Sequence, residues 1–110
     1  MTYLLSSSSI ASDSVRNTQG EDLGSIKDLM IDPNSGEVVY AILSFGGFLG
    51  LGDKYFAVPF NQLKVDRDNK CMVLQVAKDR LENAPGFDKD NWPDFADTRF
   101  LNEINSYYTY

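Results

Sequence analysis

The stretch at 43–54, LSFGGFLGLGDK, holds the residues most suggestive of chemistry, because closely spaced glycines can form a loop around a phosphate. A dinucleotide-binding loop needs glycines at i, i+2 and i+5, between a strand and a helix. Here Gly50 and Gly52 are followed at the third position by Tyr55, in a segment that predicts a strand. A P-loop needs Gly-Lys-Ser/Thr, whereas Gly52 precedes Asp53. The spacing therefore excludes both kinds of phosphate-binding loop.

The remaining candidates for catalysis or metal binding fail on residue type or spacing. The chain has no histidine, which removes Ser-His-Asp and Cys-His pairs and every zinc site that needs imidazole. The single cysteine, Cys71, lies in an apolar run and is expected to be an inert strand residue. Asp88 and Asp90 resemble the start of a calcium loop, but Trp92 and Pro93 stand where an oxygen ligand and a glycine are needed. We therefore expect no catalytic residue, no cofactor, no metal and no enzymatic activity.

Length and charge narrow the class of protein further. A chain of 110 residues is expected to form one domain. Its net charge of −6 argues against direct binding to nucleic acid or to anionic lipid, since both need clustered Lys and Arg. No stretch approaches the roughly 20 apolar residues of a membrane span, and the start of the chain lacks the basic and apolar regions of a signal peptide. We expect a cytoplasmic protein with no membrane insertion.

Alternating and β-branched residues predict several strands separated by turns. The strand at 23–32 changes parity between Ile26 and Leu29, so we expect a bulge near Lys27–Asp28. The run at 37–45 has no polar face, which predicts a strand covered on both sides. Further strands are expected at 54–60, 63–65 and 71–77, with turns at 17–20, 32–36 and 66–70, and a turn or short helix at 10–14.

After residue 77 the pattern becomes helical. A short helix is expected at 78–84, and a longer amphipathic helix follows Asp94, with Asp94 or Asn91 as its cap. The longer helix is a candidate cover for the strand at 38–43. The expected fold class is mainly β, a small, partly open antiparallel β-barrel with a C-terminal amphipathic helix. Its parts would be a flexible lead-in at 1–9, the barrel at 10–77, and a C-terminal loop and helix at 78–110, packed on the barrel in one domain.

In this arrangement the stretch from Gly46 to Asp53 connects the two strands of a hairpin. Its large apolar side chains must either fold back as a plug over one mouth of the barrel or project and meet a partner. A homodimer is the commonest form of such a contact. The residues that we predict to contact a partner or a second copy are Phe45, Phe48, Leu49, Leu51 and Trp92.

Three segments of the chain resemble the PRC-barrel family: GEDLGSIKDLMIDPNSGEVVYA at 20–41, SFGGFLGLGDKYFAVPF at 44–60 and LENAPGFDKDNWPD at 81–94. The last is similar to single-domain bacterial members. The family includes the cytoplasmic domain of the photosynthetic reaction-centre H subunit and the C-terminal domain of a ribosome-maturation factor. The resemblance implies a small, partly open β-barrel that works by protein contact and offers no catalytic residue to carry over. We expect neither the H subunit's membrane helix nor the maturation factor's second domain in this chain.

Together these observations predict a non-enzymatic interaction or assembly module. We expect it to be a homodimer that docks an unidentified protein partner through apolar surface near residues 48–51, with a link to photosynthesis by family analogy. One alternative is an auxiliary of ribosome assembly or RNA metabolism that acts through a ribosomal protein. Another is a small-molecule-binding barrel, with Tyr40, Tyr55 or Trp92 lining its mouth.

Overall fold

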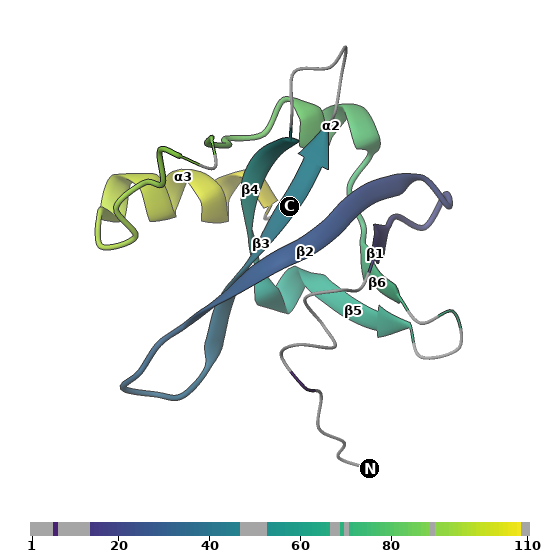
Figure 1. Ribbon diagram of the computed structural model, residues 1–110. Coiled ribbons are helices and arrows are strands. Elements are labelled where there is room, and N and C mark those ends of the chain that lie inside the picture. Colours follow the sequence, from purple (N-terminus) through teal and green to yellow (C-terminus); the bar gives the residue numbers. More distant parts are fainter. Residues whose placement is uncertain are drawn as a thin grey trace.

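The computed structural model describes residues 6, 14–46, 53–66, 69, 71–88 and 90–108. Within them the chain is mainly β, with its longest helix at the C-terminal end (Figure 1). The elements are β1 (Ser14–Arg16), β2 (Asp22–Ile31), β3 (Val38–Gly46), β4 (Asp53–Pro59), the short 3-10 helix η2 (Phe60–Gln62), β5 (Leu63–Asp66), β6 (Cys71–Leu74), α2 (Lys78–Glu82) and α3 (Thr98–Tyr108).

The strands form one six-stranded sheet in the order β4-β3-β2-β1-β6-β5, which curves into an open half-barrel (Figure 1). Neighbouring strands pair antiparallel except β1 and β6, which are parallel, with Val15 opposite Met72. The expected barrel is thus confirmed in its class and corrected in one detail, since its sheet is mixed. In the expected meander each strand would pair only with the strands next to it in the sequence. Here β1 lies between β2 and β6, and its pairing with β6 is the parallel one.

Strand β1 and the end of β6 differ from the sequence-based expectation. Ser14 was expected in a turn or short helix but begins β1, and the other residues of that expected segment lie outside the described ones. Val15 is the one apolar residue of this three-residue strand, so no alternation marks it. β6 ends at Leu74 because the Val76 N–H donates back to the Leu74 carbonyl at 2.8 Å and turns the chain.

Two bulges interrupt the pairing of β2 with β3. The first adds Lys27 to β2, between the pairs formed by Ile26 and Asp28, and confirms the bulge that the change of parity predicts. The second adds Val39 to β3, next to the pair formed by Met30, and was not foreseen. A bulge bends its strand and re-aims the extra side chain. The long hairpin of β2 and β3 is therefore bent at two places.

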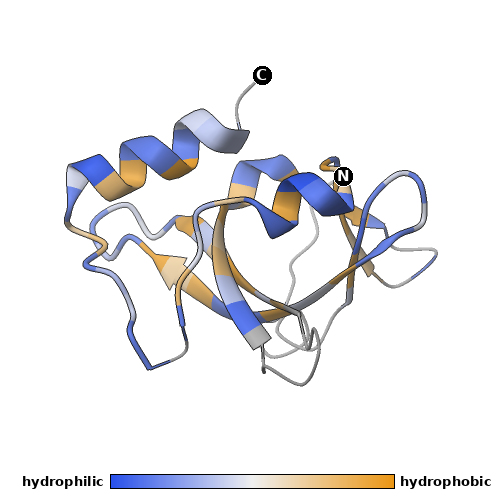
Figure 2. Ribbon diagram, turned by 90° about the horizontal axis from the view of Figure 1, so that it is seen from above, coloured by the Kyte–Doolittle hydropathy of each residue, from blue (hydrophilic) through white to orange (hydrophobic). Residues whose placement is uncertain are grey.

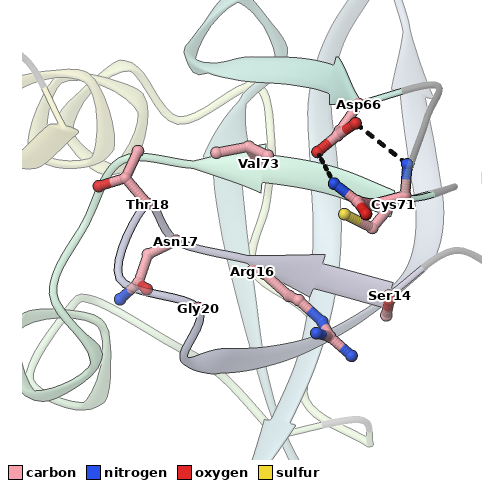
Figure 3. Close-up of a pocket in the computed structure, with 9 residues that line it drawn as sticks. Ser14, Arg16, Asn17, Thr18, Gly20, Asp66, Cys71 and Val73 are labelled. Carbon is pink, nitrogen blue, oxygen red and sulfur yellow. Dashed lines mark hydrogen bonds between the residues drawn. The ribbon is translucent and has the colours of Figure 1, made fainter.

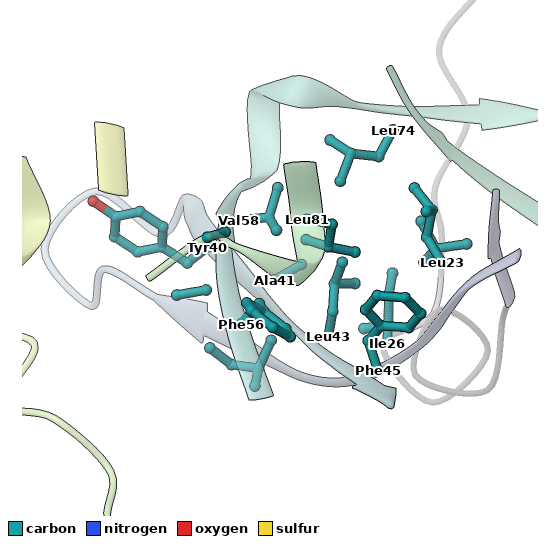
Figure 4. Packing of buried hydrophobic residues seen from close by; sticks show 14 of the residues in the cluster. Leu23, Ile26, Tyr40, Ala41, Leu43, Phe45, Phe56, Val58, Leu74 and Leu81 are labelled. Carbon is teal, nitrogen blue, oxygen red and sulfur yellow. The ribbon is translucent and has the colours of Figure 1, made fainter. Parts of the chain in front are cut away.

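Strand β3 is buried on both faces, as its unbroken apolar run predicts. On the inner face Ala41 and Leu43 stand opposite Val58 and Phe56 of β4, and Leu81 of α2 lies among them (Figure 4). All of these side chains are at most 2% exposed. Because strand residues alternate between faces, the inner residues of β3 and β4 converge on α2, which fills the concave side of the sheet.

The outer face of β3 and β4 is covered by the C-terminal segment. Ile42 and Ala57 stand opposite each other on this face and are buried, and the fully buried Ile104 belongs to α3, which packs against β4. Tyr40 reaches α3 through its hydroxyl, which donates to Asn105 Oδ1 at 3.5 Å. Figure 2 shows the hydrophobic residues of α3 on the side that faces the sheet. The amphipathic helix is therefore the expected cover, with its main contact on β4.

The N-terminal cap of α3 is Asp97, and neither Asp94 nor Asn91 holds that position. The Asp97 carboxylate accepts the Arg99 N–H at 2.9 Å, and its carbonyl accepts the Leu101 N–H at 3.1 Å. Asp94 instead closes the preceding turn, where its carbonyl accepts the Asp97 N–H at 3.0 Å. The extra turn moves the start of the helix beyond the first residue able to cap it.

A clasp between Arg80 and Tyr107 joins the two helices that cover opposite faces of the sheet. The Arg80 guanidinium donates to the Tyr107 carbonyl, and the Tyr107 hydroxyl donates to the Arg80 carbonyl. The guanidinium carbon also lies 4.3 Å from the centre of the Tyr107 ring, within the range of a cation–π contact. Helix α3 is thus held at its C-terminal end by α2 as well as by the sheet.

Gly24 is expected to be indispensable for the approach of β2 to β3. Its φ is +99°, and a Cβ there would lie 2.1 Å from the Ser44 carbonyl oxygen. Gly20 has a φ of +81° but open space around the same position, so it is the matched control. We expect Gly24→Ala to lower the free energy of unfolding by at least about 2 kcal/mol more than Gly20→Ala, because it adds a backbone clash to the shared strain. Urea denaturation of both variants measures this; equal losses would contradict the close approach.

Candidate functional site

Of the predicted contact residues, the structure describes Phe45 and Trp92. Phe48, Leu49 and Leu51 lie outside the described residues, although the pairing of Gly46 with Asp53 confirms the hairpin that they connect.

Phe45 and Trp92 lie on opposite faces of the β3–β4 pair. Phe45 is 7% exposed and belongs to the inner core, with its ring centre 6.3 Å from that of Phe56. Trp92 is 40% exposed and packs over the outer face, 5.9 Å from the ring of Tyr55. Phe45 is therefore a core residue in the described chain. The contact of residues 46–53 with a partner stays a prediction.

An aromatic cluster fixes the loop before α3 on the outer face of the sheet. Phe87 is joined to Tyr55 by two backbone hydrogen bonds of 2.9 Å, and their rings meet edge to face at 6.0 Å. Phe87 also contacts Trp92 and Phe95, with ring centres 5.2 and 6.3 Å away. Phe95 in turn contacts Tyr40 at 6.1 Å. This cluster holds Phe95 at the border between the loop and the β2–β3 hairpin.

A hollow of about 290 Å³ lies between the β2–β3 hairpin and α3, and we call it the apolar hollow. Two of its residues are the most exposed large hydrophobic side chains of the described chain, Ile31 at 58% and Val39 at 41%. Isolated apolar residues are normal on a surface, whereas contiguous apolar surface marks contact sites. Ile31 and Val39 border the same concavity, which makes it a candidate contact site. The hollow is lined by Met30, Ile31, Asp32, Val39, Tyr40, Phe95 and Leu101.

A second hollow of about 440 Å³ adjoins the first, and we call it the polar hollow. It shares Val39 and Tyr40 with the apolar hollow, so the two adjoin along these residues, and we call them together the depression. Asp32 in the apolar hollow and Glu37 in the polar hollow are the charged residues that line them, and both are acidic. The polar hollow is lined by Glu37, Val38, Val39, Tyr40, Pro59, Asn61, Gln62 and Asn105.

The turn at the end of the β2–β3 hairpin sets the positions of the two acids. As the sequence predicts, the Gly36 N–H closes it by donating to the Asp32 carbonyl at 2.8 Å, and Gly36 has a φ of +77°. The Asp32 carboxylate accepts the Asn34 N–H at 2.9 Å, and the Asp32 N–H donates to the Glu37 carbonyl at 2.8 Å. Asp32 and Glu37 are therefore held together at the base of the turn.

A third concavity, of about 510 Å³, lies where β1, β5 and β6 meet (Figure 3). The side chains of Asn17, Asp66 and Asn69, which line it, make hydrogen bonds within the fold. The buried Asn17 accepts the Gln19 and Glu21 N–H groups and donates to the Val76 carbonyl at 3.2 Å, and Asp66 is bonded to Asn69. The Cys71 thiol is buried in β6, as predicted for an inert strand residue. The Asn17 side chain therefore supports the turn at 17–20 beside this concavity.

Two further features are absent from the part of the chain that the structure describes. Among them, no group of three or more His, Cys, Asp or Glu side chains gathers where a metal ion could be held. In the same part of the chain, no helix combines the length and the apolar character needed to cross a membrane.

Sequence reasoning missed Ile31 and Val39 for an identifiable reason. Val39 belongs to a run read as buried on both sides, and the bulge turns it outward while Tyr40 and Ala41 stay buried. Ile31 pairs with Val38 just past that bulge and ends β2. The sequence carried only a weak indication of their exposure. Both residues lie close to the turn at 32–36, where a hairpin reaches the surface.

Ile31 and Val39 are expected to contribute little to stability, because both are exposed. Replacing each by Thr keeps the β-branched shape, so Ile31→Thr and Val39→Thr should change the free energy of unfolding by no more than about 0.5 kcal/mol. Ile42→Thr is the buried control and should cost about 2–4 kcal/mol, because it places a hydroxyl in the core. Denaturant unfolding measures all three; a large loss at residues 31 or 39 would show that they belong to the core.

Comparison with known proteins adds the family. The family model of the PRC-barrel domain matches residues 4–81, which covers all six strands and most of α2. No curated protein matches the chain. The aromatic cluster beyond Leu81 and helix α3 lie outside the matched residues. Because the match covers more than half of the chain and the strands form a curved half-barrel, the chain belongs to the PRC-barrel domain family.

Proposed function

We propose that the chain is a non-enzymatic protein-interaction module that binds a partner protein through the apolar hollow. The observation that carries the proposal is the exposure of Ile31 and Val39 at the border of one concavity. Membership of the PRC-barrel family is in keeping with such a role. We place the module in the cytoplasm as part of the same proposal, since its single cysteine cannot form an internal disulfide.

Desolvation of the hollow is the proposed source of affinity. Full burial of an aliphatic side chain gains about 1.5–3 kcal/mol. Because Ile31 is 58% and Val39 is 41% exposed, covering each would gain about half of that amount. A partner side chain seated in the hollow would add its own burial, and such anchors dominate the energetics of interfaces.

The walls of the hollow are fixed by contacts within the chain, which lowers the entropic cost of binding. Phe95 is held by the rings of Phe87 and Tyr40, and Tyr40 is bonded to Asn105 of α3. Leu101 belongs to α3, whose end is clasped by Arg80. The side chains that meet the partner would therefore need little reordering.

A small-molecule site at the barrel mouth has less support. Tyr55 is 8% exposed and Trp92 joins it in the aromatic cluster, and neither lines the two hollows. Among the three residues predicted to line that mouth, Tyr40 alone lines the hollows. The exposed aliphatic side chains of Ile31 and Val39 at their border suit the surface of a partner protein better.

Affinity capture after chemical cross-linking in the native cell tests the proposal. Wild type is compared with the double variant Ile31→Thr/Val39→Thr, and Glu82→Gln on the exposed side of α2 is the matched control. We expect a protein that is captured by wild type and by the control and is reduced at least about tenfold with the double variant, because the anchor contacts are weakened. Equal capture by all three would reject this surface, and no partner for wild type would reject the function.

Homodimerisation through 46–53 is a separate part of the proposal and has its own test. We expect light scattering to give the mass of a dimer for wild type and of a monomer for Phe48→Ser/Leu49→Ser, because polar residues would no longer gain from burial. The Ile31→Thr/Val39→Thr variant should stay dimeric, since Val39 and its neighbour Ile31 lie at the opposite end of β3 from Gly46. A monomeric wild type would remove the dimer and leave the interaction module intact.

A further inference from the structure

We infer that the two hollows bind a single segment of the partner protein, in which a large apolar side chain lies next to Lys or Arg. The inference rests on the proposed function and adds to it the chemistry of the partner. The apolar side chain would occupy the apolar hollow, and the cation would lie in the polar hollow. The two hollows meet at Val39 and Tyr40, so neighbouring residues of one segment can reach both.

The charge of the depression selects a basic partner. Asp32 and Glu37 line it, and no Lys or Arg is among its lining residues in the described chain. Glu37 is exposed. Within the described residues it forms hydrogen bonds through its backbone: its N–H donates to Ser35 Oγ, and its carbonyl accepts the Asp32 N–H. Arg99, on the first turn of α3, is not among the lining residues, and its Nε lies 3.6 Å from Asp97 Oδ1. A Lys or Arg of a partner would therefore meet the carboxylates of Asp32 and Glu37 with no Lys or Arg among the described lining residues to compete for them.

Amide side chains complete the polar hollow. Asn61 and Gln62 belong to η2, and Asn105 projects from α3, so amides from two elements face the same space. Amides supply both donors and acceptors, which suits the backbone of an extended segment beside a charged head group. Lys and Arg side chains also carry an apolar stem that can lie along Val39. The lining thus matches a segment with one apolar and one basic residue.

A second copy of the chain fits this depression poorly. Each copy carries a net charge of −6, and a symmetric contact here would bring the Asp32 and Glu37 pairs of two copies together. A symmetric dimer uses the same patch on both copies, so like charges would face each other across a desolvated contact. Charge complementarity therefore favours a different, basic partner segment over self-association at this surface.

Selection from a displayed library of random short peptides, with the intact chain as bait, tests the inference. We expect the enriched peptides to combine an aromatic or aliphatic residue with Lys or Arg. One enriched peptide is then synthesised with a fluorescent label, and its dissociation constant is measured by anisotropy. Asp32→Asn/Glu37→Gln should weaken binding about tenfold, because two interface charges are removed while the new amide oxygen at position 32 can still accept the turn hydrogen bond. Glu82→Gln should leave binding unchanged.

Each other outcome overturns the inference. Enrichment of peptides without basic residues, no enrichment at all, or equal affinity for wild type and Asp32→Asn/Glu37→Gln would each reject the basic segment. A dimer that is lost in Ile31→Thr/Val39→Thr would assign the depression to a second copy. The native-cell capture separates the two levels: a partner that is lost with Ile31→Thr/Val39→Thr but retained with Asp32→Asn/Glu37→Gln supports the proposed function and rejects the inference.

Discussion

Burial of β3 on both of its faces is the constraint on which the rest of the structure depends. A strand with Ala41 and Leu43 on one side and Tyr40 and Ile42 on the other cannot stand at the surface of a single-layer sheet. The curved sheet and α2 cover the inner side, and the aromatic cluster and α3 cover the outer side. The C-terminal segment is therefore part of the folded unit, although the family match ends before it.

The same hairpin that forms the core also forms the candidate site, and bulges are the reason. The bulge at Lys27 bends β2 around the core, and the bulge at Val39 turns an apolar side chain out of it. Past that point Ile31 still pairs with Val38, and the hairpin then ends in the turn at 32–36 (Figure 1). The hollow arises where this end of the hairpin faces α3. The candidate site therefore forms where the bulge at Val39 ends the buried part of β3.

Sequence reasoning found the architecture and missed the site, and the physical reasons differ. Strong local signals, such as the parity change at Lys27 and the Gly36 turn, were confirmed because they are fixed by neighbouring residues. β1 was missed because three residues carry no periodicity, and the Asp97 cap because several acids could fill that role. The exposure of Val39 depends on a register shift against another strand, which no local pattern contains.

The most direct measurement of the central claim is site-specific photo-cross-linking in the native cell. A photoreactive amino acid replaces Val39 in one variant and Glu82 in another, and covalent adducts are detected after illumination. If the apolar hollow is the contact surface, the probe at 39 forms an adduct with a distinct protein, whereas the probe at 82 does not. An adduct at 82 with none at 39 would contradict the account.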